Sequence, residues 1–380
     1  MSKPHRLPGP PPPVDVRSSG DAHLAQLLET AVAHHGRVER ATHHFHTYPA
    51  GMHPDCARDL LAALPAPGPH VHDPFCGGGT VPLEALLAGR PASGTDLSPV
   101  ALWVARTRTA QPVHASPMRS AARRIAAAAR EPGPMWIPEL AEEWYERHVA
   151  EELGRIRSEI DTVDDPSVQK LLLAVLSAIV VKASFRESDT SNRRRPYHRP
   201  PGTTAVLFHK KARELGRMLE DLPEGGDVRV RRGDARRVGP PEGTGLVLTS
   251  PPYPGVYDYL PMQQLRYAWL DLDPGVGMAE EVGARRTFRA RGRKDALRGW
   301  RADTNAWVGC QARGLATDGF MAIVVGDGLV GGKKVDTLGP TVDAMKAAGL
   351  DVVARASADR PDHARDTVRT EHLVLGKKEG

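Results

Sequence analysis

The stretch "HVHDPFCGGGTVPLEALLAGRPASGTDL", residues 70–97, decides the fold class. Residues 70–75 are predicted to form a short strand, and the three glycines that follow predict a tight turn. Residues 81–89 are predicted to form a helix that ends at Gly89, and residues 92–97 a second strand. A strand, a turn, a helix and a second strand in this order are typical of a βαβ unit, which requires a parallel sheet.

The same alternation resumes far along the chain. Strand patterns recur in "DVRVRRGDA", "GLVLTSPPY", "GFMAIVVGDG", "LDVVARAS" and "EHLVLGKK", whereas the region between the two alternating parts has long helical patterns and hardly any strand signal. We therefore predict an α/β fold in which one sheet domain is interrupted. The predicted parts are a disordered proline-rich tail at 1–21, the sheet domain at 22–110 and 223–380, a helical insertion at 111–222 and an arginine-rich basic loop at 275–300.

Composition sets the outer limits of the interpretation. The chain has 380 residues, of which 40% are hydrophobic, so it can build a large core. Its net charge of +5 is compatible with a polyanionic partner. The cysteines Cys56, Cys76 and Cys310 form no paired framework, which indicates a reducing compartment and predicts a cytoplasmic protein. The beginning of the chain has no apolar segment, and we expect neither a signal peptide nor a membrane span.

The glycine turn and a downstream acid suggest a nucleotide cofactor. Asp96 ends the second strand 19 residues after Gly77, where a carboxylate can hold the hydroxyls of a ribose. The turn is not followed by Lys-Ser or Lys-Thr, so it is not a P-loop. It also lacks the G-x-G-x-x-G spacing, which favours a single adenosine-bearing cofactor over a dinucleotide.

A second unusual stretch is "VLTSPPYPGVYDY", residues 247–259. Proline has no N–H to donate to a sheet, so the pair Pro251-Pro252 ends the strand and leaves main-chain carbonyls available. The Ser250 hydroxyl and these carbonyls can accept the N–H groups of an amine, and the Tyr253 ring offers a face for stacking a base. A proline-rich turn without function is the alternative at this point.

Together the two motifs resemble a known family. Phe75, Gly77 and Gly79 reproduce the F-x-G-x-G signature of amino-group DNA methyltransferases, and residues 250–253 resemble their [S/N/D]-P-P-[Y/F] motif. The serine form is similar to that of the cytosine-N4 enzymes. The resemblance covers roughly residues 43–108 and 226–376. It implies a Rossmann-like class I methyltransferase fold, with a mainly parallel seven-stranded sheet, and S-adenosylmethionine as the cofactor.

The resemblance also implies roles for individual residues. The segment "FHTYPAGMHP" looks like the one that covers the methionine end of the cofactor, and Asp234 in "RRGDARRV" looks like the acid near the adenine. The implied catalytic residues are Ser250, Pro251, Pro252 and Tyr253. The implied cofactor-binding residues are His46, Tyr48, Asp73, Phe75, Gly77, Gly79, Thr80, Asp96 and Asp234. The chain has no Pro-Cys dipeptide, which disfavours cytosine-C5 chemistry, and no histidine cluster with metal-ligand spacing, so we expect no metal.

Two basic runs are candidates for holding nucleic acid. We expect phosphate contacts from Arg193, Arg194, Arg195, Arg199, Arg289 and Arg291, with DNA as the partner and a cognate restriction endonuclease as a companion protein. The leading prediction is a DNA methyltransferase that acts on cytosine N4. The alternatives are adenine-N6 methylation of DNA, guanine-N2 methylation of RNA, and a non-catalytic cofactor-binding partner.

Overall fold

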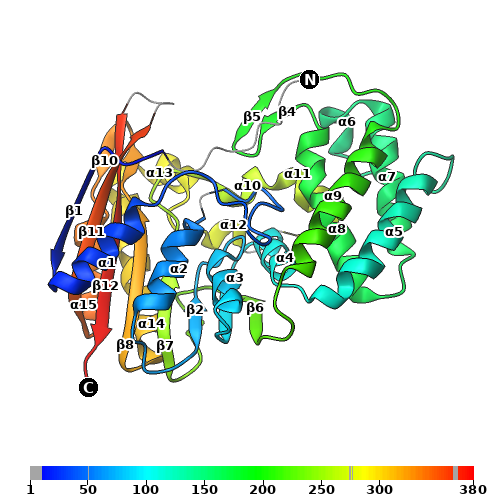
Figure 1. Cartoon of the computed structure of the whole chain (residues 1–380). Coiled ribbons are helices and arrows are strands. Elements are labelled where there is room, and N and C mark those ends of the chain that lie inside the picture. The colour runs from blue at the N-terminus through cyan, green and yellow to red at the C-terminus, as the bar shows by residue number, and fades with distance from the viewer. Residues whose placement is uncertain (1–10, 50, 274, 276, 363–366) are drawn as a thin grey trace.

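A computed structural model of the chain describes residues 11–49, 51–273, 275, 277–362 and 367–380. Its centre is an eight-stranded sheet with the order β1-β11-β12-β8-β7-β2-β3-β6 (Figure 1). The strands are β1 (Asp15–Gly20), β2 (Val71–Asp73), β3 (Ala92–Asp96), β6 (Val228–Arg232), β7 (Thr244–Thr249), β8 (Leu315–Gly326), β11 (Leu350–Asp362) and β12 (Thr367–Lys378).

The strand directions confirm the predicted fold. Neighbouring strands from β6 through β3, β2 and β7 to β8 are parallel. Strand β12 runs antiparallel to both β8 and β11, so that β11 points the same way as the parallel strands. These seven strands form the mainly parallel sheet of a class I methyltransferase, and β1 adds an eighth strand at its edge.

Strand β1 corrects the prediction of a disordered tail. Residues 15–20 were expected to lie in that tail, but they pair with β11 from Asp15 opposite Asp359 to Gly20 opposite Ala354. The bonds to β11 satisfy the backbone groups of a strand that would otherwise be a long exposed edge. Residues 1–10 of the predicted tail lie outside the described residues.

Helices cover both faces of the sheet. On one face, α1 (Ala22–Ala33), α2 (Pro54–Ala63) and α3 (Thr80–Leu87) pack against residues such as Leu246 and Phe320. On the other face, α14 (Arg293–Arg313) and α15 (Leu338–Ala347) pack against Val247 and Ile323. Successive side chains of a strand point to opposite faces, so β7 supplies both cores and is buried along its whole length.

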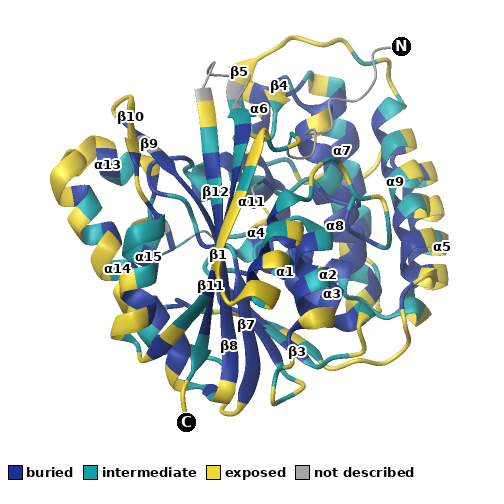
Figure 2. Ribbon diagram, turned by 60° about the vertical axis from the view of Figure 1, so that its left-hand side comes forward, coloured by how far each residue is buried: buried dark blue, intermediate teal, exposed yellow. Residues whose placement is uncertain are grey.

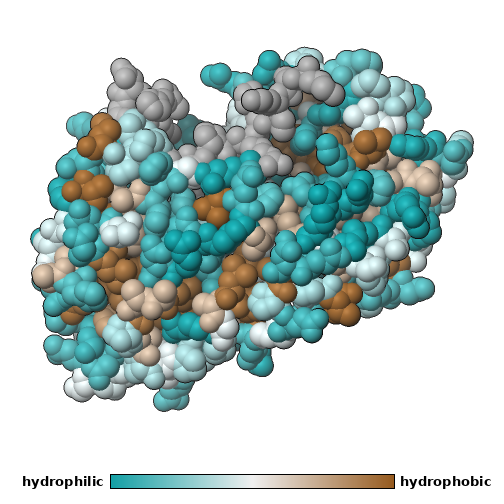
Figure 3. All heavy atoms as spheres, in the orientation of Figure 1, coloured by the Kyte–Doolittle hydropathy of each residue, from teal (hydrophilic) through white to brown (hydrophobic). Residues whose placement is uncertain are grey.

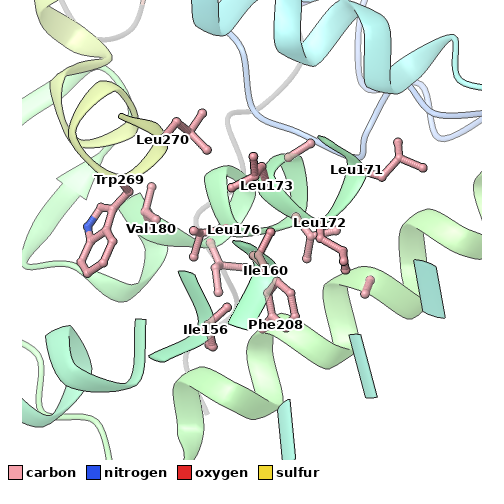
Figure 4. Packing of buried hydrophobic residues seen from close by; sticks show 14 of the residues in the cluster. Ile156, Ile160, Leu171, Leu172, Leu173, Leu176, Val180, Phe208, Trp269 and Leu270 are labelled. Carbon is pink, nitrogen blue, oxygen red and sulfur yellow. The ribbon is translucent and has the colours of Figure 1, made fainter. Parts of the chain in front are cut away.

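The region of the predicted insertion is mainly helical. It contains η1 (Pro112–His114), α5 (Ala115–Ala128), α6 (Ala141–Trp144), α7 (Arg147–Asp161), α8 (Pro166–Ala183) and α9 (Thr203–Glu220), with a hairpin of β4 (Arg186–Ser188) and β5 (Ser191–Arg194) before α9. Figure 4 shows Ile156, Leu172, Leu176 and Phe208 packed together, with Trp269 at the side of the cluster. Trp269 belongs to α11 (Gln264–Leu270), and the same cluster includes residues of α3 and α4 (Pro99–Arg108). The insertion therefore shares a continuous core with the sheet domain.

Helix α8 is the centre of this core. By length and composition it could cross a membrane, contrary to the expectation that no segment would qualify. However, 67% of its apolar window is buried inside the protein. Helix α8 contacts α7, α9 and α11, and its apolar residues pack against these helices.

The predicted basic loop at 275–300 is helical. It forms α12 (Gly277–Glu280), α13 (Arg285–Arg291) and the start of α14, and it follows the short helix α10 (Tyr259–Met262) and α11. Phe288, Ala296 and Trp300 are buried in a small cluster with residues of the hairpin β9 (Gly328–Val330) and β10 (Lys333–Val335). Positions 296 and 300 are four residues apart and lie on one helical face, a pattern that the many arginines around them concealed in the sequence.

Candidate active site

The two motifs meet at the point where the strand order reverses. Strands β2 and β7 are parallel neighbours, with Val71 opposite Leu246. The chain continues from β2 to β3 and β6 on one side, and from β7 to β8 on the other. The glycine turn follows β2 and residues 250–253 follow β7, so both lie at the carboxyl edge of the sheet. In parallel α/β sheets this switch point is where ligands bind.

A cavity of about 1400 Å³ opens at this edge. The space-filling view shows that hydrophilic side chains cover much of this face of the molecule (Figure 3). Most of the residues predicted for the site line the cavity: His46, Tyr48, Asp73, Phe75, Gly77, Thr80, Asp96, Asp234, Ser250, Pro252 and Tyr253. Gly79 and Pro251 do not line it, and Pro251 is buried.

Gly79 has a packing role. It adopts a φ of +82°, and a Cβ built on it would lie 2.7 Å from the Cβ of Ala105 on α4. Its lack of a side chain lets the turn lie directly against this helix. Gly77 also has a positive φ, of +47°, and lies under the ring of Tyr48. The first glycine therefore faces the cavity and the last one permits helix packing.

Asp96 is placed to receive hydroxyl groups. One carboxylate oxygen accepts a hydrogen bond from the Gly77 amide at 2.9 Å, and the other accepts from the Ser98 amide at 2.8 Å. Burial raises the pKa of Asp96 to about 6. A carboxylate has about four acceptor positions, so the bonds from these backbone amides leave acceptor capacity for hydroxyls from the cavity.

Asp73 joins the two motifs at their base. Its carboxylate accepts a hydrogen bond from the Thr249 hydroxyl at 2.7 Å and from the Phe75 amide at 3.1 Å. Burial raises the pKa of Asp73 to about 7. Because Thr249 is the last residue of β7 and Phe75 begins the glycine turn, Asp73 fixes the spacing between the turn and the residues 250–253.

Asp234 forms the third acidic group of the cavity. The guanidinium of Arg236 donates to both of its oxygens, with a shortest distance of 2.7 Å, and also donates to Asp303 of α14 at 2.7 Å. Burial acts to raise the pKa of Asp234, but the hydrogen bonds from Arg236 outweigh it and hold the pKa below its ordinary value. Asp234 is thus a fixed, ionised acceptor at neutral pH.

The loop after β7 is braced from two directions. The hydroxyl of Tyr253 donates to Glu371 of β12 at 2.9 Å, and the ring lies against Gly326, where a Cβ would be 2.4 Å from a ring carbon. The amide of Gly255 donates to the carbonyl of Gly283 at 2.9 Å. The sequence analysis did not identify Glu371, because it is 118 residues from Tyr253 and belongs to an ordinary strand pattern.

Arg108 is a second residue that the sequence analysis missed. Its guanidinium is buried and donates to the carbonyls of Gly78 at 2.9 Å and of His43 and His46 at 2.8 Å each. Among the described residues it has no carboxylate partner, and burial lowers its pKa to about 10. Arg108 therefore ties the segment before α2 to the glycine turn. Arg108 is the last residue of α4, and no sequence motif around it indicates this role.

His46 and Tyr48 lie on the segment that Arg108 holds. The Nε2 of His46 is 2.9 Å from the Ser177 hydroxyl on α8, and burial lowers the pKa of His46 well below its ordinary value. Burial raises the pKa of Tyr48 well above its ordinary value. Both side chains are therefore neutral at physiological pH, and they close one side of the cavity without adding charge.

The predicted phosphate-binding arginines fall into two groups. The Arg194 guanidinium lies 5.6 Å from the centre of the Phe185 ring and 5.8 Å from that of Trp144. Arg199 donates to the carbonyls of Lys182 and Ala183 at the end of α8. These two side chains hold the β4–β5 hairpin in place. The other four, Arg193 and Arg195 beside them and Arg289 and Arg291 on α13, are exposed, as Arg194 is, but have no such packing contact among the described residues.

One group of potential metal ligands occurs among the described residues, at His34, His53 and Asp55. It does not include His43, His44 or His46, which lie close together in the sequence. The carboxylate of Asp55 already pairs with Arg40 at 2.5 Å and with Arg58 at 2.7 Å. Two guanidinium groups on the same carboxylate oppose the binding of a cation there.

Comparison with known proteins gives local and weak similarities. No family model matches the chain. The type II methyltransferase M.MvaI of Kocuria varians is 32% identical over 75 residues, which are 19% of this chain and only 16% of that protein. Among solved structures, TrmN from Thermus thermophilus is 14% identical with a TM-score of 0.35, and the alignment covers 86% of this chain and 48% of TrmN.

Two further structures have similar values. The rRNA methyltransferase aviRa from Streptomyces viridochromogenes is 13% identical with a TM-score of 0.33, and 88% of each chain is covered. A geranyl diphosphate methyltransferase in complex with SAM is 12% identical with a TM-score of 0.35, and 86% of each chain is covered. The local match to M.MvaI and the strand order of the sheet together support the class of S-adenosylmethionine-dependent methyltransferases.

Proposed function

We propose that this protein transfers a methyl group from S-adenosylmethionine to the exocyclic N4 amine of cytosine in DNA. The observation that carries the proposal is that the Ser250–Tyr253 loop and the glycine turn with Asp96 line one cavity, from the adjacent strands β7 and β2. A site for an amine and a site for an adenosine-bearing cofactor are thus next to each other.

The acidic residues of the cavity fit the cofactor. S-adenosylmethionine, when bound, supplies a methyl group on a positively charged sulfur. Asp96 keeps acceptor capacity for the ribose hydroxyls, and Asp234 is an ionised acceptor for the adenine amine. The segment with His46 and Tyr48 covers the remaining end of the cavity, and Arg108 keeps it there.

The loop after β7 fits the amine. The nitrogen of an exocyclic base amine is a poor nucleophile because its lone pair is delocalised into the ring. The Ser250 hydroxyl and the carbonyl of Ser250 or Pro251 can accept its two N–H groups and orient the lone pair toward the methyl carbon. The new N–C bond forms as the S–C bond breaks, and the nitrogen then loses one proton to solvent. Positioning and electrostatics supply most of the acceleration.

Cytosine is proposed as the base on the basis of the serine. A short hydroxyl at position 250 leaves room beside the Tyr253 ring, whose orientation is held by Glu371. The resemblance to the serine-type enzymes and the local match to a type II methyltransferase support DNA as the substrate. Adenine N6 fits the same loop, and RNA guanine N2 is an outcome of the experiment below.

Mass spectrometry of nucleosides tests the proposal. The protein is incubated with labelled S-adenosylmethionine and either unmethylated genomic DNA of mixed sequence or total tRNA. N4-methylcytosine in the DNA is expected. Labelled N6-methyladenine alone would overturn the assigned base, and label only in N2-methylguanosine of the tRNA would overturn the assigned nucleic acid. No label in either sample, with cofactor binding intact, would indicate a non-catalytic protein.

A serine variant tests the role of the loop. Ser250→Ala should bind the cofactor normally and lose about 10²-fold in kcat, by analogy with the loss of a single oxyanion-hole donor. Ser120→Ala, on the exposed side of α5, is the matched control and should keep full activity. Full activity of Ser250→Ala would remove this hydroxyl from the mechanism.

A further inference from the structure

We propose that duplex DNA is held by the basic surface of α13, the start of α14 and the β9–β10 hairpin, rather than by the β4–β5 hairpin. This inference rests on the proposed function, because it takes DNA as the substrate. The surface, called here the α13–β10 surface, consists of the exposed residues Arg289, Arg291, Arg293, Lys294 and Lys333. Figure 2 shows exposed residues along α13, the adjoining part of α14 and β10 at one end of the molecule.

The charge of the α13–β10 surface favours DNA. The α13–β10 surface has five cationic side chains, and among the described residues none of them forms an ion pair with a carboxylate. The nearby acids already have partners: Asp295 pairs with Arg298 at 3.0 Å, and Asp258 pairs with Arg285 at 3.4 Å. A concentration of uncompensated positive charge matches the phosphate backbone of a polyanion.

The α13–β10 surface is also rigid. Phe288, Trp300 and Val335 are buried in the small cluster that joins α13, α14 and β10. The guanidinium of Arg293 also donates to the carbonyl of Lys334 at 3.3 Å, which links segments about 40 residues apart in the chain. The cationic side chains therefore belong to a rigid part of the protein, so DNA binding costs less conformational entropy.

The α13–β10 surface is connected to the loop after β7. The amide of Arg285 donates to the carbonyl of Tyr257 at 3.0 Å, and the amide of Gly255 donates to Gly283 at 2.9 Å. A helix rises 1.5 Å per residue, so Arg289 and Arg291 lie about 6 and 9 Å along α13 from this contact. Duplex DNA carries one phosphate charge per roughly 1.7 Å of its axis. A nucleotide turned into the cavity would therefore leave its neighbouring phosphates within reach of the α13–β10 surface.

The β4–β5 hairpin is less suited to this role. Arg194 packs on Phe185 and Trp144, and Arg199 donates to carbonyls at the end of α8. Of the four arginines predicted there, Arg193 and Arg195 have no such contact of their guanidinium groups in the described chain, and Arg195 lines the cavity itself rather than the surface beside it.

The salt dependence of DNA binding tests the inference. Fluorescence anisotropy of the full chain with a labelled duplex gives the slope of log K against log salt concentration. The triple variant Arg289→Gln, Arg291→Gln and Lys294→Gln should reduce the magnitude of this slope by about 2 to 3, since each phosphate contact contributes roughly 0.9. The control variant replaces three exposed cations of the insertion by glutamine, Arg123, Arg130 and Lys170, and should leave the slope unchanged.

Because both triple variants lose the same charge, a difference between them cannot come from net charge. Equal slopes for the two variants would overturn the inference, as would a larger loss of slope in Arg193→Gln with Arg195→Gln. Cofactor affinity, measured by calorimetry, should be unchanged in the triple variant and shows that the catalytic domain is folded. If the wild-type chain binds tRNA and not the duplex, the proposed DNA substrate fails instead, and this result is separate from the comparison of variants.

Discussion

Removing the charge of Asp96 should weaken S-adenosylmethionine binding strongly. In Asp96→Asn the side chain keeps its size, but the ionised acceptor for the two ribose hydroxyls is lost. Hydrogen bonds to a charged group contribute about 1.5–3 kcal/mol, which corresponds to a loss of roughly 10- to 150-fold in affinity at pH 7.5. In the wild type the amide of Gly77 donates to Asp96 at 2.9 Å. In the variant this amide would face either the NH₂ group or the uncharged oxygen of the asparagine.

The pKa of Asp96 adds a test by pH. Burial places this pKa at about 6 in the free protein, and hydroxyl donors of the ligand favour the ionised form. The affinity is therefore almost fully present above pH 7 and is lost as the pH falls through 6. A group with this pKa is about 90% ionised at pH 7 and about 10% ionised at pH 5, so the dissociation constant should rise roughly tenfold between these values.

Isothermal titration calorimetry at pH 5, 6 and 7 measures this effect. The wild type should show the tenfold change, and Asp96→Asn should show little of it. Asp73 has a pKa of about 7 and titrates in the same range, so Asp73→Asn is the matched control and should keep the pH dependence. The assignment is refuted if Asp96→Asn binds with wild-type affinity, or if its affinity falls with pH as steeply as that of the wild type.

Three other predictions follow from contacts in the site. Arg108→Met should lower the free energy of unfolding, measured in urea, by about 3 kcal/mol and raise the KM for the cofactor, because three carbonyls lose a buried donor. The control Arg106→Met, on the exposed side of the same helix, should lower the free energy of unfolding by less than about 1 kcal/mol. Gly79→Ala should destabilise by about 2–4 kcal/mol in the same assay, whereas Gly89→Ala, with a φ of +67° and no atom within 4 Å, should cost about 1 kcal/mol. Glu371→Ala should lower kcat without changing cofactor affinity, and Glu371→Gln, which retains an acceptor oxygen, should restore most of the activity.

The sequence by itself determined the parts of this protein that depend on neighbours in the chain. The strand, glycine turn, helix and acid of residues 70–97 follow from local periodicity and turn chemistry, and the structure has β2, α3 and β3 there. Ser250 and Tyr253 were found because prolines after a buried strand are a local signal. The meeting of the two motifs in one cavity was also predictable, because the topology of a parallel sheet brings the carboxyl ends of its strands together.

Only the tertiary structure decided the contacts between distant segments. Strand β1 pairs with β11, which lies more than 330 residues later in the chain. The sequence of β1 contains no local pattern that shows that the edge of β11 is available for pairing. Arg108 and Glu371 act on the site from the end of a helix and from the last strand, where arginine and glutamate would ordinarily be solvated. The arginine-rich segment 275–300 was predicted as a loop because its charges dominate the composition. Burial of Phe288 and Trp300 against β10 makes it helical, because the apolar contacts of a few residues outweigh the solvation preference of the many charged ones, which remain exposed.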